Sequence, residues 1–390
     1  MCGLFYAENY YIKIFIKNYK NSYLKLIMNK QILYCNKNEY PAFPSIVKLE
    51  KDKYLVSFRL APKNKKNYSH LHSLSKAIVL TYYKNKIINT TEIAKEDDAA
   101  KQDVQLFRVD DKTIIAYYFR YTFHPQSEID LLKENTFLEY NNTIALLSGI
   151  GYCISYDNGK TFSKYNTIVL KNGMKNFAAR GSMVKVNNEI LMPIYAFKKY
   201  INKNNSKYQC YVIYTKDLIN WDIKSFLCET EYRKIDNKKS KLEYVEPSLI
   251  YCNNVLWAFI RTHVNDEYAF TSLSYSLDNG KSFTKLCFTN IKGYPLNPLK
   301  IDESRVLLSY GYRLKPYGVR AILVNDLNDL KNYSDYDIQK KEIIIEDKMK
   351  STDCGYPWCD NDNNKIYCVY YGYDNKDKIR KIFLSVFTLD

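Results

Sequence analysis

The sequence predicts an all-β protein, a six-bladed β-propeller, and two observations carry this prediction. From about residue 40 onward, short apolar runs rich in Val, Ile, Tyr and Phe alternate with polar turns of Asn, Asp and Lys. A segment of the form S-x-D-x-G-x-[ST]-F also recurs along the chain. Runs of β-branched and aromatic residues bounded by such turns are typical of β-hairpins. A repeat of about 60 residues holding about four strands is typical of propeller blades.

Six such hairpins are expected between residues 40 and 390. The first joins Ser45–Leu49 to Tyr54–Phe58 through a polar turn near residue 51. The other turns fall near residues 111, 187, 253, 302 and 362. The spacing between turns is roughly 60 residues, which leaves room for the four strands of a blade. No amphipathic helix of ordinary length competes with these strands.

The recurring segment is an Asp box, also called a BNR repeat. Ser155–Phe162 and Ser276–Phe283 are good copies, and Thr215–Trp221 is a degenerate one. Their aspartates are 60 and 61 residues apart, in register with the hairpins. An Asp carboxylate accepts backbone N–H groups across a tight turn, and Gly supplies a positive φ. We therefore expect these segments to close turns and to have no catalytic role.

Residues 1–39 precede the repeating pattern. They are expected to be an N-terminal extension or to reflect a mis-assigned start, since Met28 is an alternative first residue. Charged residues interrupt the apolar ones here, so the segment lacks the pattern of a signal peptide. No apolar run approaches the roughly 20 residues of a membrane helix. We expect a cytoplasmic protein with no membrane span, and a secreted one only if the N-terminus is mis-assigned.

The composition is that of a globular protein, with 46% apolar and 26% charged residues in 390. The 58 Lys and Arg exceed the 42 Asp and Glu by 16. Because the basic residues are spread out and interleaved with acidic ones, the net charge is weak evidence for nucleic-acid binding, and an anionic small substrate or a surface polysaccharide is equally compatible with it. Ten cysteines without a CxxC pair argue against zinc. We expect no metal and no cofactor.

Two segments at the starts of hairpins carry residues with useful chemistry. Glu246-Pro247-Ser248 opens the fourth hairpin, which ends at Arg261, and Gly355-Tyr356-Pro357 opens the sixth. Together with the Asp boxes, this pattern resembles the sialidase (neuraminidase) superfamily, and more closely its bacterial BNR-repeat glycosyl hydrolases. The resemblance covers residues 40–390. It implies an exo-glycosidase in which a tyrosine helped by a glutamate attacks the sugar, a loop aspartate is the acid/base, and three arginines clamp a carboxylate.

The resemblance assigns roles to individual residues. Tyr356 matches the nucleophile and Glu246 its activating base, because an ionised carboxylate beside a phenol makes it a usable nucleophile. Arg261 matches the second arginine of the clamp. Arg320 fits the third best, and Arg313 is a neighbour that also reaches the site. A guanidinium binds a carboxylate through two parallel hydrogen bonds, which Lys cannot do.

The sequence also departs from the family pattern. Ala42 stands where the first arginine belongs, unless Arg59 at the end of the same hairpin substitutes for it. The loop over 61–75, which should hold the acid, has no Asp but contains His70 and His72. His70 is our candidate acid, since imidazole titrates near neutral pH; the segment 97–103 supplies alternative acids in Asp97, Asp98 and Asp103. The second acid that supports the tyrosine is replaced by Tyr371, and Arg180 is expected to point into the central funnel and to supply specificity.

Two functions remain open at this point. The first is a glycoside hydrolase for a sialic-acid-like or other acidic sugar, acting through the Tyr/Glu pair. The alternative is a non-catalytic glycan-binding propeller, since half of the clamp is altered. Both imply a carbohydrate partner, and they differ in whether Tyr356 meets Glu246 within hydrogen-bonding distance.

Overall fold

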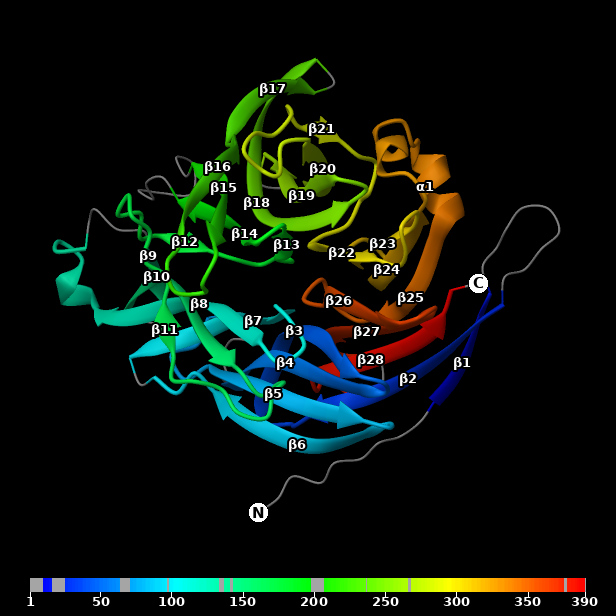
Figure 1. The fold of residues 1–390 in the computed structure, drawn as a ribbon, viewed down its shortest axis with the longest axis horizontal. Coiled ribbons are helices and arrows are strands. Elements are labelled where there is room, and N and C mark those ends of the chain that lie inside the picture. The colour runs from blue at the N-terminus through cyan, green and yellow to red at the C-terminus, as the bar shows by residue number, and fades with distance from the viewer. Residues whose placement is uncertain are drawn as a thin grey trace.

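We describe the protein from a computed structural model. It describes residues 10–15, 25–63, 71–96, 98–132, 137–140, 143–197, 207–235, 237–265, 268–374 and 377–389. Its strands form six antiparallel sheets, arranged as the blades of a propeller around one axis (Figure 1). The predicted fold class is confirmed.

In each of the first three blades, the chain runs outward from the axis. Blade 1 consists of β3 (Glu39–Glu50), β4 (Lys53–Pro62), β5 (Lys76–Tyr83) and β6 (Lys86–Ile93). Blade 2 consists of β7 (Ala99–Arg108), β8 (Ile114–Pro125), β10 (Thr143–Ser155) and β11 (Asn166–Thr167), with β9 (Phe137–Tyr140) paired to β10 and the 3₁₀ turn Gln126–Glu128 after β8. Blade 3 consists of β12 (Phe177–Ala178), β13 (Val184–Val186), β14 (Glu189–Phe197), β15 (Tyr208–Thr215) and β16 (Asp222–Glu229).

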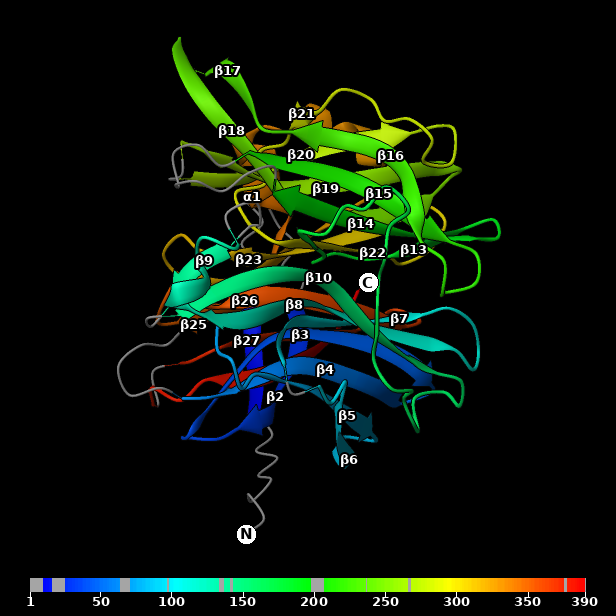
Figure 2. The ribbon, with the colours of Figure 1, turned by 90° about the vertical axis from the view of Figure 1, so that its left-hand side faces the viewer.

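Blades 4 and 5 follow the same order with two additions. Blade 4 consists of β18 (Lys238–Cys252), β19 (Val255–Val264), β20 (Tyr268–Ser276) and β21 (Cys287–Phe288), and β17 (Glu231–Ile235) pairs with the start of β18. Figure 2 shows this added hairpin projecting beyond the neighbouring strands. Blade 5 consists of β22 (Leu296–Lys300), β23 (Val306–Tyr312), β24 (Tyr317–Val324) and β25 (Glu342–Met349), and Leu327–Lys331 (3₁₀) and α1 (Asp335–Lys341) precede β25.

Blade 6 joins the two ends of the chain. Its inner strands are β26 (Gly355–Asp362), β27 (Lys365–Gly372) and β28 (Lys381–Thr388). The fourth strand is β2 (Lys25–Cys35), which pairs with β28 and in turn with β1 (Tyr10–Phe15). The structure therefore adds part of the segment that we set apart as an extension to the sheet of the last blade. This pairing closes the ring.

The hydrophobic core is divided among the junctions between blades. Each of six clusters of buried side chains is dominated by the facing sheets of two successive blades. The cluster between blades 6 and 1, for example, packs Tyr54 and Phe58 with Tyr367 and Val369. The alternating apolar residues predicted for the hairpins are those that fill these junctions, because alternate side chains of a strand point to opposite faces of its sheet.

The segments that we compared with the Asp box form turns between the third and fourth strands of blades 2, 3 and 4. Asp157 accepts hydrogen bonds from the Thr161 backbone N (2.9 Å) and Oγ1 (2.6 Å), and Asp278 makes the equivalent pair with Ser282. These donors favour the ionised carboxylate and lower the pKa of Asp157 to about 2. Gly159 has a φ of 79°, where a Cβ would lie 2.3 Å from Leu55.

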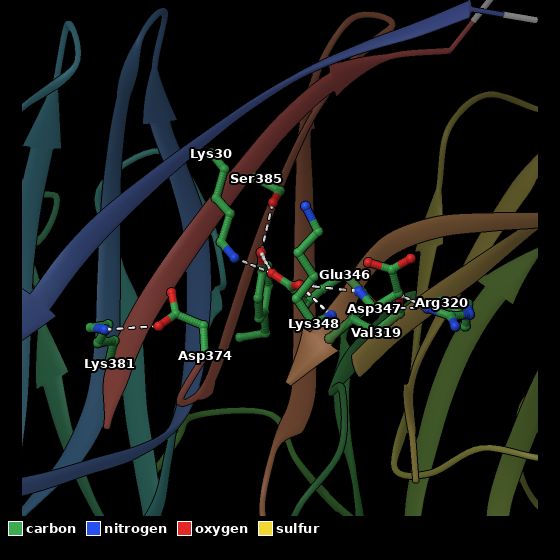
Figure 3. A network of polar contacts seen from close by, with 10 residues as sticks. Lys30, Val319, Arg320, Glu346, Asp347, Lys348, Asp374, Lys381 and Ser385 are labelled. Atoms are coloured by element: carbon green, nitrogen blue, oxygen red, sulfur yellow. Dashed lines mark hydrogen bonds and ion pairs between the residues drawn. The ribbon is translucent and has the colours of Figure 1, made fainter. Parts of the chain in front are cut away.

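A buried ion pair fastens the closing strand β2 (Figure 3). Lys30 of β2 pairs with Glu346 of β25, and the Glu346 side chain is 4% exposed. The same carboxylate accepts the Lys348 backbone N (2.8 Å) and the Tyr370 hydroxyl (3.3 Å), and Tyr370 is also bonded to Ser385 of β28 (2.9 Å). One carboxylate thus connects blades 5 and 6 with the N-terminal strand.

Because of this arrangement, Glu346→Ala should destabilise the protein strongly. It leaves the Lys30 ammonium buried without its counter-ion, a change that typically costs about 3–5 kcal/mol. Urea unfolding followed by fluorescence measures the effect. Glu303→Ala, which removes an exposed pair with Lys300, is the matched control and should change the unfolding free energy by less than about 1 kcal/mol. Equal effects of the two substitutions would contradict this role for Glu346.

Candidate active site

Four inner strands carry the same irregularity at the axis. In β3, β7, β18 and β26, the pairing with the second strand shifts register, and the extra residue has a left-handed backbone. These bulge residues are Phe43 (φ 56°), Asp103 (47°), Glu246 (49°) and Tyr356 (49°). A β-bulge turns a side chain away from the regular direction of its strand. Such backbone conformations are strained in non-glycine residues and concentrate at functional sites.

The bulge residues of blades 4 and 6 meet each other. The Tyr356 hydroxyl donates a hydrogen bond to Glu246 Oε1 (2.8 Å). Arg261 Nη1 donates to Glu246 Oε2 (2.8 Å) and lies 3.3 Å from the Tyr356 hydroxyl. The structure therefore brings together three of the residues that the sequence predicted for the site, across 110 residues of chain.

Burial and charge set the protonation of this pair. Burial alone would raise the pKa of Glu246, but the charge and hydrogen bonds of Arg261 and the bond from Tyr356 hold it below its ordinary value. Burial, followed by the negative charge of Glu246, raises the pKa of Tyr356 above the ordinary phenol value. The resting pair is thus an ionised carboxylate that accepts a hydrogen bond from a neutral phenol.

Two further arginines surround the Tyr356 ring. The Arg313 guanidinium carbon lies 5.2 Å from the ring centroid, and that of Arg180 lies 5.1 Å from it and 5.0 Å from the Trp358 ring. Arg180 Nη2 also donates to the Tyr356 carbonyl (3.4 Å). Within the described part of the chain, Arg261 Nε and Arg313 Nε and Nη2 are buried without a hydrogen-bond partner. Buried polar groups are normally bonded, so these donors are suited to a ligand.

Arg320 lies apart from this cluster, which corrects our choice of the third arginine. Its Nη1 donates to the Glu346 carbonyl (2.6 Å), and its Nε lies 3.7 Å from the Glu342 carboxylate. The reason is its place in β24, the third strand of blade 5, which is paired to the outer strand β25. Arg313 directly follows β23, the second strand of blade 5, and Arg261 lies in β19, the second strand of blade 4. Both side chains contact the Tyr294 ring.

Arg59 occupies in blade 1 the place that Arg261 occupies in blade 4. Arg59 is the cross-strand partner of Ala42, just before the Phe43 bulge, as Arg261 is of Val245. It is fully buried, and its guanidinium carbon lies 5.6 Å from the Tyr40 ring. Burial raises the pKa of Asp103, and the positive charge of Arg59 is one of the effects that oppose this rise.

Asp103, one of our alternative candidates for the acid, lies beside Arg180 of the site. Its carboxylate lies 3.5 Å from Arg180 Nε, and the side chain is 6% exposed. Burial raises its pKa to about 7, against the opposing effect of Arg180 and with a further contribution from the Glu246 charge.

His70, our first candidate acid, lies outside the described residues. Its neighbour His72 accepts the Leu74 backbone N at Nδ1 (3.1 Å), and burial with the Arg59 charge lowers its pKa.

Several site residues were not singled out from the sequence. Phe43 packs edge-on against the Tyr356 ring at 4.8 Å. Asp353 accepts hydrogen bonds from the hydroxyls of Tyr40 (2.6 Å) and Tyr371 (2.7 Å) and pairs with Arg380, so Tyr371 supports the segment that leads to Tyr356.

A proline follows three of the four bulge residues, at 44, 247 and 357. This recurring X-Pro at the start of inner strands was the signal available for finding Phe43.

Comparisons with known proteins agree with the fold. No protein-family profile and no curated protein matches the sequence. Among solved structures, the chain is similar to a protein of unknown function from Dyadobacter fermentans (TM-score 0.80, 23% identity, 93% of this chain and 98% of that one). It is also similar to the Hadza microbial sialidase Hz136 (0.61, 12%, 90% and 66%) and to a Trypanosoma rangeli sialidase in complex with sialic acid (0.56, 12%, 97% and 58%).

The fold is that of the sialidases. A GH93 α-L-arabinofuranosidase of Fusarium graminearum, solved with arabinobiose, shares it over 98% of both chains at 11% identity and a TM-score of 0.56. The sialidase-like propeller therefore holds glycosidases for different sugars. Among the described residues, no group of His, Cys, Asp and Glu is arranged to hold a metal ion, and none of the helices is long and apolar enough to cross a membrane.

The raised pKa of Asp103 predicts a pH-dependent stability. The unfolded carboxyl ionises near pH 3.8, whereas the folded one stays protonated up to about pH 7. The neutral form thus contributes stability below the unfolded pKa, and this contribution is lost as pH rises towards 7. Relative to wild type, Asp103→Asn should gain more than about 1 kcal/mol of unfolding free energy between pH 5 and pH 7, since one pKa unit corresponds to about 1.4 kcal/mol.

Urea unfolding at pH 5, 6 and 7 measures this gain. Asp157→Asn is the control, because a carboxyl whose pKa is lowered to about 2 is ionised throughout this range. Its difference from wild type should stay constant. If the Asp103→Asn difference is equally constant, the carboxyl of Asp103 is ionised in the folded protein at pH 5, contrary to our expectation.

Proposed function

We propose that the protein is a glycoside hydrolase that removes a terminal sialic-acid-like or other acidic sugar from a glycan. The observation that carries this proposal is the hydrogen bond between Tyr356 and Glu246, flanked by the unpartnered donors of Arg261 and Arg313. A phenol beside a carboxylate is the constellation of an activated nucleophile. The fold shared with sialidases and an arabinofuranosidase supports a sugar substrate.

The balance of charge around Tyr356 supports an anionic substrate. Arg180, Arg261 and Arg313 approach its ring or hydroxyl, while Glu246 is the ionised carboxylate among them. Asp103 adds at most a partial negative charge near neutral pH, since its pKa is about 7. A ligand carboxylate would bind to the donors without a partner in the described residues, Arg261 Nε and Arg313 Nε and Nη2, because guanidinium donors match carboxylate geometry.

The same charge explains the choice of nucleophile. A carboxylate nucleophile would repel the negative group of the substrate, whereas the phenol of Tyr356 is neutral. As its oxygen bonds to the anomeric carbon, its proton passes to Glu246, and Asp103 protonates the departing glycosidic oxygen. In the second step, Asp103 takes a proton from water as the hydroxide bonds to the anomeric carbon. The proton on Glu246 then returns to the released Tyr356 oxygen, so that the enzyme is regenerated.

A second candidate is a glycan-binding propeller without catalysis. Ala42 favours it, because it stands where the resemblance to sialidases places an arginine of the clamp, and the arginine of blade 1 is instead its cross-strand partner Arg59. Such a protein would bind acidic sugars through Arg261 and Arg313 but would release no product from any of them. Turnover by the wild type therefore distinguishes the two candidates.

Tyr356→Phe should lower turnover by several orders of magnitude without unfolding the protein, because it removes one hydroxyl. The measurement is hydrolysis of a panel of fluorogenic glycosides that includes sialosides and uronides. Tyr310→Phe is a matched control, since it removes another buried phenol that donates to a glutamate, Glu342 (2.7 Å), at a distance from the axis. A Tyr356→Phe variant with full activity on the best substrate would end the tyrosine-nucleophile proposal.

The acid role of Asp103 predicts a fall in kcat/KM as pH rises through about 7. In Asp103→Asn, this fall in kcat/KM with rising pH (the alkaline limb of the pH profile) should disappear. Turnover of substrates with alkyl leaving groups should fall by about 10²–10⁴. Aryl glycosides should suffer less, because their leaving groups need less protonation. His70→Gln is the comparison variant. If it removes the limb and Asp103→Asn leaves it in place, the acid is His70.

A further inference from the structure

Tyr294 is an aromatic residue of the site that the proposed reaction does not use. It precedes β22 in blade 5 and is half-buried. The guanidinium carbon of Arg261 lies 4.1 Å from its ring centroid, and that of Arg313 lies 5.0 Å from it. One ring thus contacts both arginines whose donors are left for a ligand. Its backbone N donates to the Gly311 carbonyl (2.9 Å), which fixes it to the strand that leads to Arg313.

Two arginines this close to each other need a reason to stay together. Both guanidinium groups are positively charged, and like charges that contact one ring repel each other. Glu246 is hydrogen-bonded to Arg261, so it offsets mainly one of the two charges. An aromatic face attracts cations through its quadrupole, and the attraction is stronger where water is excluded.

Contact with the ring also leaves several donors of the two guanidinium groups without a hydrogen-bond partner among the residues that the structure describes. Contact with an aromatic face leaves the N–H donors of a guanidinium group unbonded. In the described residues, these are the unpartnered Arg261 Nε and Arg313 Nε and Nη2. No hydrogen bond is found for the Tyr294 hydroxyl within the same part of the chain, so the ring is the part that acts.

We propose that Tyr294 is a positioning residue, whose ring holds Arg261 and Arg313 together as a two-armed clamp for the carboxylate of an acidic sugar. The clamp's ligand rests on the proposed function, whereas the arrangement of the arginines does not.

Two substitutions separate the ring from the hydroxyl. Tyr294→Phe keeps the aromatic face, and Tyr294→Leu removes it with a smaller change in bulk than alanine would cause. In crystal structures, both guanidinium groups should keep their places in Tyr294→Phe, and Arg313 should leave the Tyr356 ring in Tyr294→Leu. This readout requires no activity. Unmoved arginines in Tyr294→Leu, or displaced ones in Tyr294→Phe, would overturn the proposal.

Affinity supplies the second readout. Calorimetry with N-acetylneuraminate and glucuronate should show binding by wild type and Tyr294→Phe, and at least about tenfold weaker binding by Tyr294→Leu, a difference of about 1.4 kcal/mol. With a substrate, KM should rise in Tyr294→Leu while kcat changes little. Combining Tyr294→Leu with Arg313→Gln should add little to the loss from Arg313→Gln alone, because both act through one arm; fully additive losses count against the proposal.

The controls distinguish this proposal from the proposed function. Tyr275→Leu removes a ring contacted by Lys331 at 4.3 Å, outside the site, and should leave sugar affinity unchanged. If wild type binds neither acidic sugar, the proposed function fails while the crystal structures still decide the role of Tyr294. If Tyr294→Leu proves too unstable to crystallise, Tyr294→Met is the second non-aromatic variant, with the same expected displacement of Arg313.

Discussion

The closure of the ring is the constraint on which the rest of the structure depends. Each blade presents an apolar face to the next, and the six junctions contain the hydrophobic core. Strand β2 adds Met28 to the junction of blades 5 and 6 and Leu33 to that of blades 6 and 1, and it is held by its pairing with β28 and by the Lys30–Glu346 ion pair. Because the candidate site is built from side chains of several blades, it exists only in the closed ring. The chemistry at the axis therefore depends on an ion pair near the rim of the propeller.

Within the closed ring, backbone strain determines which side chains reach the axis. The bulges of four inner strands aim Phe43, Asp103, Glu246 and Tyr356 towards one another. The cost of a left-handed residue is about 1–3 kcal/mol at each position, and the packed blades maintain it. The same irregularity thus presents an apolar ring, two carboxyl groups and a phenol. The four bulge positions share one backbone conformation but carry different side chains, and this difference gives the axis its mixture of apolar and ionisable groups.

Electrostatics then gives the two carboxyl groups different protonation states. Glu246 contacts Arg261 and the Tyr356 hydroxyl, which favour its ionised form. Asp103 is buried beside Arg180 at 3.5 Å, and burial outweighs that charge, so its pKa is raised to about 7. Two carboxyls whose environments move their pKa values apart are suited to act as base and acid in one reaction. Arg261, which holds the pKa of Glu246 low, also keeps an Nε donor without a partner in the described part of the chain.

The sequence by itself determined the all-β propeller, because hairpin periodicity and turn residues are local properties that repeat with the blades. It also pointed to Tyr356, Glu246 and Arg261, which contact one another in the structure, since each stands at a fixed place relative to its own hairpin. It misplaced Arg320, because whether an arginine points to the axis depends on the strand that carries it, and Arg313 on the inner side is only seven residues away in the chain. The meeting of Asp103 with Arg180, and of Tyr294 with two arginines from different blades, was decided by the tertiary structure alone. These contacts join residues that share no local pattern, and only the closed ring brings them within reach of one another.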